Sequence, residues 1–269
     1  MDDRAIAEEA LSVLGTGRQI KPFTARHPGF DLTDAYRVAQ IICDLRAARG
    51  ETPVGRKIGF TNRSAWPMFG GRAPIWARMY ATTVHDLGSH LQATLAGLAE
   101  PRIEPEIVFG LAAAPTPEMD ARGLAGCIDW VAHGFEIVHS IYPGWKRLPA
   151  DAIVGFGMHA SLWIGPRHPF RSRATEWIVE LTSFEIELFR NGAAIVRGRG
   201  SNVLDGPLNA LRALVAVLAA DDQSPALAAG EIVSTGSITP AEPIAGGEVW
   251  TTRIAGIPLE DFRLALIAR

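Results

Sequence analysis

The hydrophobic pattern of this 269-residue chain changes its period at Pro53. Before that point apolar residues recur every three or four positions, as from Val38 to Leu45, which is the spacing of one helix face. The spacing predicts helices over residues 3–14 and 33–50, the second ending at Gly50. Beyond Pro53 short β-type runs are separated by glycine and proline, which number 27 and 18 in the chain. We therefore predict an α+β fold, with a helical N-terminal layer over residues 1–50 and a β-rich core over residues 51–269.

Turn and capping residues mark the expected elements of the β-rich core. Strands are predicted over residues 54–61, 103–111, 134–140, 161–165 and 177–189, with further short strands between 231 and 266. Asn191-Gly192 predicts a hairpin turn, and Thr116-Pro117-Glu118 and Asp205-Gly206-Pro207 are typical of helix starts. The sequence contains no internal repeat, low-complexity tract or flexible linker. We therefore expect residues 1–269 to form a single domain.

Composition excludes several classes of protein. A formal net charge of -3 and a pI near 6.2 provide no basic field for a phosphate backbone, so we expect no nucleic-acid partner. The N-terminus has no basic segment followed by an apolar one, and the apolar stretch 214–220 is far shorter than the roughly 20 residues that span a bilayer. We expect neither secretion nor a membrane partner. Cys43 and Cys127 are too few for a zinc cage or a disulfide framework, which indicates reduced core thiols in the cytoplasm.

A glycine-rich segment offers a possible nucleotide motif. Gly155, Gly157 and Ala160 match the G-x-G-x-x-A fingerprint, which needs a helix directly after it to bind a pyrophosphate. Residues 161–166 instead predict a strand ended by Gly-Pro, so we assign no dinucleotide site. The chain also has no P-loop, G-x-S-x-G or H-E-x-x-H motif. Its seven histidines show no pair on one helix face, which favours structural roles over metal ligation.

Two glutamates occupy alternate positions in the predicted strand 103–111. Because residues i and i+2 of a strand share a face, Glu104 and Glu106 would lie about 6.6 Å apart and repel each other by about 2.5 kcal/mol at an effective dielectric of about 20. A bound cation or a solvated strand face would relieve this repulsion. The pattern leaves both open, since Glu185 and Glu187 repeat the same alternation. Pro105 removes a backbone donor, which predicts a sheet edge or a cavity mouth.

Two further charges lie in β-type runs. Glu136 is the single charge in the run 134–138, and a carboxylate buried in such a run needs a partner. Lys57 lies in the run 55–59. Spacing alone does not distinguish a functional lysine from a solvated one.

Five segments carry a family resemblance. They are 55–62 (GRKIGFTN, compared with G-x-K-I-G-x-T-S), 104–107 (EPEI), 135–140 (FEIVHS), 205–208 (DGPL), and 230–232 with 235–237 (GEI and TGS). Together they resemble the 2-keto-4-pentenoate hydratase and 4-oxalocrotonate decarboxylase family of the fumarylacetoacetate hydrolase superfamily, over most of the chain. The resemblance implies a mixed β-roll core, like the C-terminal domain of that superfamily, with a helical N-terminal region, in a homo-oligomer.

The resemblance also implies roles for individual residues. Glu104, Glu106 and Glu136 take the positions of the ligands to Mg²⁺ or Mn²⁺, and Lys57 takes the position of the active-site lysine. The substrate-binding positions are Ser161, Thr235, Gly236 and Ser237, and His139 and His159 are auxiliary candidates. An all-oxygen ligand set suits a hard cation, and a 2-oxo acid offers two oxygens for chelation.

The function implied by the resemblance is that of a single-domain, metal-dependent hydratase, a carbon–oxygen lyase. Its substrate would be a 2-hydroxy-2,4-dienoate or related 2-oxo acid in the catabolism of aromatic or related compounds. A decarboxylase of the 4-oxalocrotonate type is the second choice, because the same electron sink serves both reactions. An acylpyruvate hydrolase and a catalytically idle homologue that partners a sister enzyme are further alternatives.

The chain departs from the family pattern in three segments. No acidic residue follows Pro74-Ile75-Trp76-Ala77 near Ala81-Thr82, His139-Ser140-Ile141 replaces D-S-R, and Met158-His159-Ala160-Ser161 replaces a D-N-A-S-like run. The candidates to replace the missing acid are His85, Asp86, His139 and His159. For a bulkier or less acidic substrate we expect an apolar pocket lined by Trp66, Trp76 and Met79.

Overall fold

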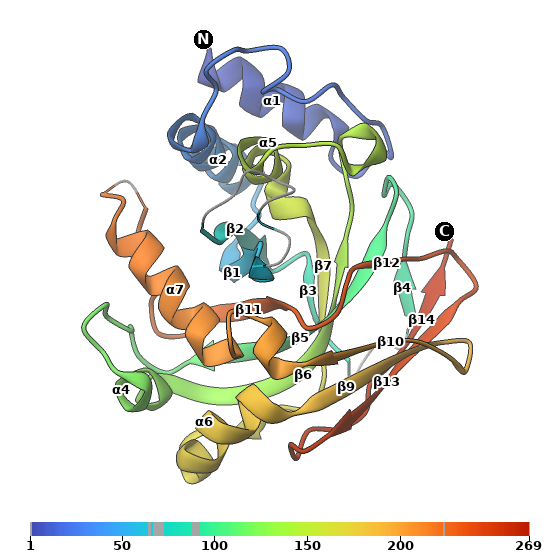
Figure 1. The fold of residues 1–269 in the computed structure, drawn as a ribbon. Coiled ribbons are helices and arrows are strands. Elements are labelled where there is room, and N and C mark those ends of the chain that lie inside the picture. Colours follow the sequence, from blue (N-terminus) through green and yellow to red (C-terminus); the bar gives the residue numbers. More distant parts are fainter. Residues whose placement is uncertain (1, 64–65, 67–72, 88–91, 223, 269) are drawn as a thin grey trace.

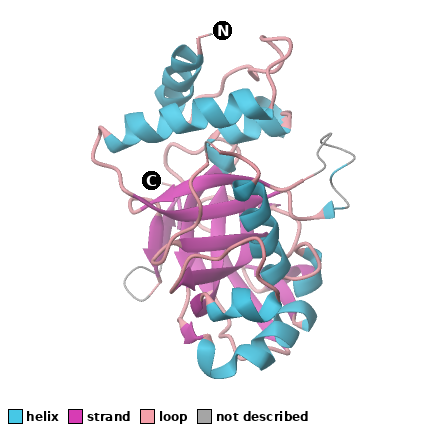
Figure 2. Cartoon of the chain, turned by 90° about the vertical axis from the view of Figure 1, so that its left-hand side faces the viewer, coloured by secondary structure: helices cyan, strands magenta, loops and turns pink. Residues whose placement is uncertain are grey.

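The computed structural model describes residues 2–63, 66, 73–87, 92–222 and 224–268. In this part of the chain two β-sheets form the body, and the first two helices lie together at one end of it (Figures 1 and 2). The helices are α1 (Asp3–Val13), α2 (Leu32–Ala47), α4 (Ala121–Gly126), α5 (Pro149–Val154), α6 (Ala174–Ser183) and α7 (Pro207–Ala219), with 3-10 turns η2 (Pro143–Trp145), η3 (Phe156–Met158), η4 (Arg171–Arg173) and η5 (Gly200–Asn202).

The larger sheet is mixed and carries the functional candidates. Its strands, in spatial order, are β2 (Ile75–Tyr80), β1 (Pro53–Gly59), β11 (Ile232–Ser237), β5 (Arg102–Leu111), β6 (Ile128–Val138), β7 (His159–Ile164) and β3 (Val84–Asp86), with β12 (Glu242–Pro243) beside β5 and β8 (His168–Pro169) beside β6. β1 runs parallel to β11 and β3 runs parallel to β7, whereas the other pairs are antiparallel. The α+β prediction with a mixed sheet is confirmed.

The smaller sheet packs against the larger one. Its order is β10 (Ala193–Arg199), β9 (Glu185–Arg190), β13 (Val249–Ala255), β14 (Arg263–Ile267) and β4 (Gln92–Thr94). Asn191 and Gly192 join β9 to β10 with φ values of 51° and 83°, so the predicted hairpin is confirmed. Buried side chains from both sheets, including Phe135, Trp163 and Trp250, form a common core.

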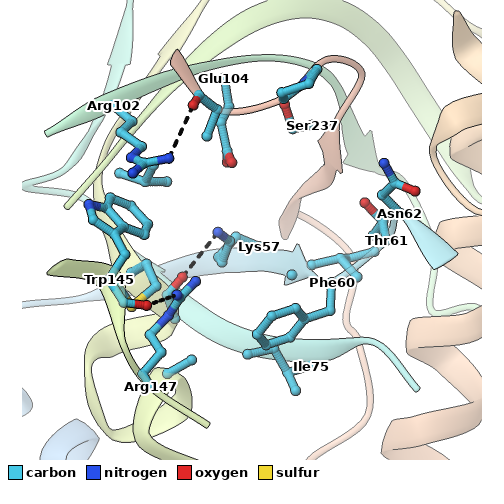
Figure 3. A pocket seen from close by; sticks show the side chains of 18 of the residues that line it. Lys57, Phe60, Thr61, Asn62, Ile75, Arg102, Glu104, Trp145, Arg147 and Ser237 are labelled. Atoms are coloured by element: carbon cyan, nitrogen blue, oxygen red, sulfur yellow. Dashed lines mark hydrogen bonds between the residues drawn. The ribbon is translucent and has the colours of Figure 1, made fainter. Parts of the chain in front are cut away.

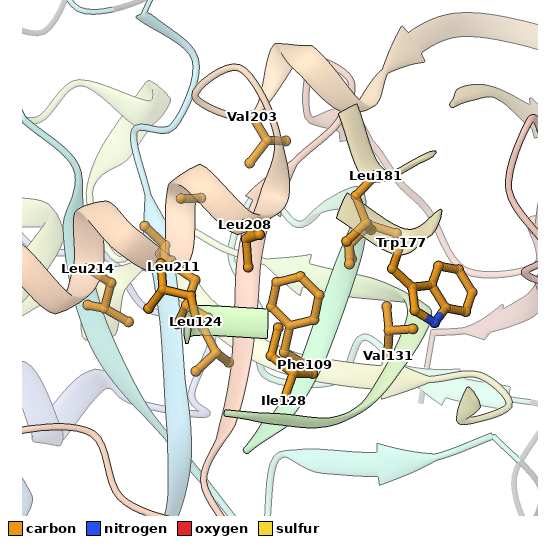
Figure 4. Packing of buried hydrophobic residues seen from close by; sticks show 14 of the residues in the cluster. Phe109, Leu124, Ile128, Val131, Trp177, Leu181, Val203, Leu208, Leu211 and Leu214 are labelled. Carbon is orange, nitrogen blue, oxygen red and sulfur yellow. The ribbon is translucent and has the colours of Figure 1, made fainter. Parts of the chain in front are cut away.

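Three helices pack against the larger sheet in a core cluster separate from the one between the two sheets. α4, α6 and α7 contribute to the largest core cluster, in which Leu211 and Leu214 of α7 are fully buried, as is Phe109 of β5 (Figure 4). Among the described residues, Gly200–Ala219 is the one helical stretch with the length and hydropathy of a membrane span. It is longer than the apolar stretch 214–220 that was considered from the sequence. Its burial, 56% of the apolar window, is that of a core helix, so it gives only weak support for a membrane span.

The predicted N-terminal helices are confirmed, with ends that the sequence explains. Asp2 caps α1, and Asp31 and Asp34 form a capping box at the start of α2. Both helices pack with α5 in a separate cluster that also includes Ile75 of β2. The sequence pattern did not predict α5, a single short helix that begins at Pro149.

The structure corrects three sequence predictions. The region 177–189 is not one strand, because Trp177 and Leu181 are buried while Val179 between them is 65% exposed, which is helical spacing. The helix expected from residue 116 begins instead at Ala121, where Asp120 accepts a hydrogen bond from the Gly123 amide.

The third correction concerns Pro105, for which the sequence predicted a sheet edge or a cavity mouth: the neighbouring Glu104 borders a cavity, but the strand is not at an edge. Its strand β5 is central, between β11 and β6. The register of β11 shifts between Ser234 and Ser237, opposite this proline, and the Pro105 carbonyl accepts from the Ile238 amide at 3.0 Å. The missing proline donor therefore coincides with an irregularity in the neighbouring strand.

Candidate active site

Three glutamates meet on one face of the larger sheet. Glu104 lies directly opposite Glu136 in the antiparallel register of β5 and β6, and Glu106 follows two residues along β5. One carboxylate oxygen from each lies within 4.8 Å of the others. Glu106 and Glu136 are fully buried, while Glu104 borders a cavity. The structure thus brings together the carboxylate pair and the isolated carboxylate identified from the sequence.

The charge of this triad is poorly balanced. Burial raises the pKa of Glu104 to about 7 and that of Glu106 well above its ordinary value, and the neighbouring Glu136 raises both further. Burial opposes ionisation of Glu136 as well, but the Lys57 ammonium and a hydrogen bond from His159 lower its pKa to about 2. One lysine therefore faces three carboxyl groups, and additional positive charge would stabilise all three in ionised form.

Glu106 has the bonding pattern expected of a metal ligand. Its Oε2 accepts hydrogen bonds from the Ser234 hydroxyl and from the Gly236 amide at 3.0 Å. Its Oε1 has no hydrogen-bond partner among the described residues although it is buried. Gly236 is required here because its φ is 105° and a Cβ would lie 2.2 Å from Thr61 Oγ1. An oxygen-only donor set with a free oxygen fits a hard divalent cation.

Lys57 reaches the triad from β1. Its Nζ lies 2.9 Å from Glu136 Oε2 and donates to the Gly157 carbonyl at 3.1 Å. Burial opposes protonation of Lys57, but the three carboxylates outweigh it and raise its pKa. Gly157 can approach the lysine closely because it has no Cβ. A Cβ at this position would lie 3.1 Å from Lys57 Cδ and 2.5 Å from the Ala77 Cβ. Figure 3 shows Lys57 inside the cavity that Glu104 borders.

One histidine contacts a carboxylate of the triad, and a second, buried histidine interacts with the first. His159 donates from Nδ1 to Glu136 Oε1 at 2.7 Å, and its Nε2 lies 2.9 Å from Thr83 Oγ1. His139 is buried, with neither ring nitrogen hydrogen-bonded among the described residues. Burial and the nearby His159 lower the pKa of His139 to about 4, so it is neutral at pH 7. Neither histidine is among the described residues that line the cavity.

The four positions expected to bind substrate are placed differently. Ser237 lines the cavity. Gly236 holds Glu106, and the Thr235 hydroxyl donates to the Ile107 carbonyl at 2.9 Å inside the core. Ser161 accepts from Trp163 Nε1 at 2.9 Å on β7 and is not among the described lining residues. Of the four, Ser237 is therefore the one exposed to a ligand in this cavity.

The cavity has a volume of about 450 Å³, within the range typical of small-molecule sites. Trp66, Trp76 and Met79 are not among its described lining residues; Trp76 and Met79 are buried in core clusters instead. Its apolar wall comes from the following residues: Ile58, Phe60, Ile75, Val138, Trp145 and Met158. Two arginines, Arg102 and Arg147, also line it. The sequence reasoning missed these arginines, although Arg102 lies two residues before the first glutamate of the triad.

The candidates to replace the missing acid also lie outside the described cavity lining. His85 stacks on Trp163 with ring centroids 4.5 Å apart, and Asp86 pairs with Arg167 at 2.7 Å. The segment around Ala81 forms the turn between β2 and β3. Among the described lining residues Glu104 carries the only carboxylate.

Because His159 holds Glu136 in place, we expect the His159→Leu variant to bind Mn²⁺ about 10–100-fold more weakly than the parent. The His159→Asn variant should recover much of the loss, since an asparagine amide can occupy the position of Nδ1. Calorimetric titration of chelator-treated protein measures both affinities. Unchanged affinity in the leucine variant would contradict this role.

The mixed sheet that carries the carboxylate triad defines the fold class of the protein. The fold is that of the fumarylacetoacetate hydrolase superfamily. It is shared with fumarylpyruvate hydrolase from Pseudomonas aeruginosa, solved with Mn²⁺ and pyruvate, at a TM-score of 0.57 and 14% identity over 81% of this chain and 91% of that chain. At this identity the likeness concerns the fold alone.

The particular family follows from sequence relatives. A 2-keto-4-pentenoate hydratase from Paraburkholderia phymatum is 31% identical over 95% of this chain and 96% of its own length, and a 2-hydroxyhexa-2,4-dienoate hydratase from Comamonas testosteroni is 29% identical over 93% and 92%. The chain belongs to the 2-keto-4-pentenoate hydratase family. The 4-oxalocrotonate decarboxylase from Pseudomonas putida G7, solved with magnesium and adipate, has a TM-score of 0.88 and 25% identity over 98% of this chain and 97% of that chain. No family model matches the chain.

Proposed function

We propose that this protein is a metal-dependent hydratase, a carbon–oxygen lyase that adds water to a 2-hydroxy-2,4-dienoate in the catabolism of aromatic or related compounds. The observation that carries the proposal is the triad of Glu104, Glu106 and Glu136 beside Lys57, of which Glu104 and Lys57 line a cavity. The hydratase names of relatives at 29–31% identity support it. We further propose that it is a cytoplasmic homo-oligomer without a nucleic-acid or membrane partner.

The three glutamates would hold Mg²⁺ or Mn²⁺, the ions named with the decarboxylase and the fumarylpyruvate hydrolase. When bound, the cation acts as a Lewis acid that stabilises the negative charge on a 2-oxo acid as it enolises. His159 and Gly236 orient the carboxylates. Removing a proton from the water that attacks the substrate is a separate task, and Glu104 is the one carboxylate among the described residues that line the cavity.

Lys57 is the group proposed to move protons. Protonation of the dienol at its terminal carbon gives a conjugated 2-oxo acid, and the Lys57 ammonium is the buried acid inside the cavity. Water then adds to the conjugated double bond. The Phe60 and Ile75 side chains form an apolar part of the same cavity wall.

Decarboxylation is the second candidate, favoured by the TM-score of 0.88 with 4-oxalocrotonate decarboxylase. Proton NMR distinguishes the two reactions. With Mg²⁺ or Mn²⁺ and 2-hydroxypenta-2,4-dienoate or its six-carbon homologue, hydration yields a 4-hydroxy-2-oxo acid, whereas decarboxylation requires 4-oxalocrotonate and releases carbon dioxide. Absence of any metal-dependent product from these substrates would reject the enzyme proposal and favour an idle homologue.

For the five-carbon dienoate we expect proton exchange to be faster than hydration. Glu104 is the only carboxylate among the described lining residues and is assigned to the cation, so no second carboxylate is left there to act as the base that deprotonates water. General-base catalysis is typically worth about 10²–10⁴-fold, so water addition should lag behind ketonisation by a factor in that range. In deuterated water, NMR should show deuterium entering the substrate before the hydrated product accumulates.

A longer substrate that fills the cavity should be hydrated faster than the five-carbon dienoate, because its reacting carbons are held more firmly. Equal rates of exchange and hydration on the five-carbon compound would show that Lys57 suffices as the base for both steps.

A further inference from the structure

A buried histidine joins the strand of Glu106 to the smaller sheet. His133 lies on β6 opposite Ile107 of β5, so its side chain points away from the face of the sheet that carries the glutamates. Its Nδ1 lies 3.1 Å from the Glu106 carbonyl oxygen, and its Nε2 lies 3.0 Å from Thr252 Oγ1 on β13. The Glu106 peptide therefore has a side-chain partner in addition to the pairing of β5 with β6.

The partners of the ring assign its tautomer. A carbonyl oxygen only accepts hydrogen bonds, so Nδ1 of His133 carries a proton and donates to Glu106. Burial lowers the pKa of His133 to about 4, so the ring is neutral at pH 7 and Nε2 accepts from the Thr252 hydroxyl. Thr252 Oγ1 in turn accepts from the Phe262 amide at 2.9 Å. The hydrogen bonds therefore run in one direction, from the smaller sheet to the Glu106 carbonyl.

The surroundings of this ring are otherwise apolar. Its centroid lies 5.8 Å from that of the Phe135 ring and 5.5 Å from that of the Phe262 ring, and both pairs are T-shaped. A phenylalanine at position 133 would satisfy this packing without burying two nitrogen atoms, which costs free energy unless each nitrogen is hydrogen-bonded. The imidazole of His133 therefore supplies hydrogen bonds that packing alone does not require.

The backbone around Glu106 is where the strand pairing is irregular. Pro105 has no amide proton to donate, and the register of β11 shifts beside this stretch of β5. Side chains supply hydrogen bonds there, because the Thr235 hydroxyl donates to the Ile107 carbonyl at 2.9 Å and His133 donates to the Glu106 carbonyl. These bonds restrain the peptide from which the Glu106 carboxylate projects. They thereby restrain its buried Oε1, which has no hydrogen-bond partner among the described residues.

We propose that His133 is a positioning residue for the metal site, which restrains the backbone of Glu106 and is itself oriented by Thr252 of the smaller sheet. The proposal rests on the proposed function, because it assumes that Glu106 is a metal ligand. His133 is not among the described residues that line the cavity, so its effect reaches a bound ion through Glu106. The smaller sheet thus contributes to metal affinity without supplying a ligand.

Two substitutions of His133 separate hydrogen bonding from packing. His133→Phe keeps an aromatic ring but cannot donate, and we expect it to bind Mn²⁺ about tenfold or more weakly than the parent. In His133→Asn the side-chain amide replaces the Nδ1 donor, so this variant should recover much of the affinity although its smaller side chain lowers the melting temperature. Calorimetric titration of chelator-treated protein with Mn²⁺ measures the affinities, and thermal melting measures the stabilities.

The electron paramagnetic resonance spectrum of bound Mn²⁺ reports the geometry of its ligands. The spectrum of His133→Phe should differ from that of the parent, and the spectrum of His133→Asn should resemble it. Thr252→Val leaves the histidine in place and removes the hydroxyl that orients it, so its spectrum should change in the same sense as that of His133→Phe. An unchanged spectrum in Thr252→Val would overturn the role of the smaller sheet.

A matched control is Leu264→Ala, in the core cluster that includes Phe135 and Phe262, which should lower the melting temperature and leave Mn²⁺ affinity unchanged. Parent-like affinity in His133→Phe would overturn the proposal and leave the proposed function standing. Equal losses of affinity in His133→Asn and Leu264→Ala would also overturn it, since stability alone would then set the affinity. If the parent binds no Mn²⁺, the proposed function fails and this proposal fails with it.

Discussion

Replacing Lys57 by methionine is expected to lower turnover by about 10²–10⁴-fold, the usual contribution of a positioned acid or base. Lys57 is the cationic side chain in contact with Glu136, and it lines the cavity beside Glu104. Methionine preserves most of the side-chain volume and removes the transferable proton. Substrate consumption measured by ultraviolet absorbance, and deuterium incorporation measured by NMR, should fall together because both depend on proton transfer.

The stability of this variant separates catalysis from folding. Breaking a buried ion pair costs about 3–5 kcal/mol, so the metal-free Lys57→Met variant should melt at a lower temperature than the metal-free parent. A bound cation can balance the Glu136 charge in its place, and the Mg²⁺-loaded variant should recover much of this loss. Lys146→Met, at an exposed lysine next to Arg147 in the sequence, is the matched control and should keep its activity. Retention of turnover in Lys57→Met would remove Lys57 from the mechanism.

Replacing Glu106 by glutamine is expected to weaken Mg²⁺ and Mn²⁺ binding by about 100-fold or more, since one charged ligand of three is lost. The glutamine oxygen can still accept from Ser234 and Gly236, so the local backbone should remain in place. The metal-free variant should be at least as stable as the metal-free parent, because burial and Glu136 already disfavour the charge of Glu106. Calorimetry and thermal melting with and without the ion measure both effects.

The chain supplies its own control for this experiment. Glu187 belongs to the second alternating pair of glutamates, on β9, where Arg197 pairs with it at 2.9 Å and Arg199 pairs with Glu185 at 2.6 Å. Glu187→Gln should leave metal affinity unchanged. Tight metal binding by Glu106→Gln, or an equal loss in Glu187→Gln, would refute the assignment of the triad.

The two glutamate pairs also show where sequence information ends. Both pairs share one face of a strand, as the period of two requires. One pair meets a third carboxylate and a lysine in the interior, and the other meets arginines near the surface. The alternation is local, but the partners come from strands distant in the sequence, so their identity depends on sheet order and register.

The sequence by itself determined the features that depend on local backbone geometry. These include the two N-terminal helices, the Asn191-Gly192 hairpin, the start of α7 at Pro207 and the shared face of Glu104 and Glu106. Tertiary structure decided the rest. Residues 174–183 form a helix rather than a strand, and β5 lies at the centre of its sheet. Ser161 is not among the described residues that line the cavity, whereas Arg102 and Arg147 line it. Neighbouring residues set the first group, whereas contacts between distant segments, which no short sequence window contains, set the second.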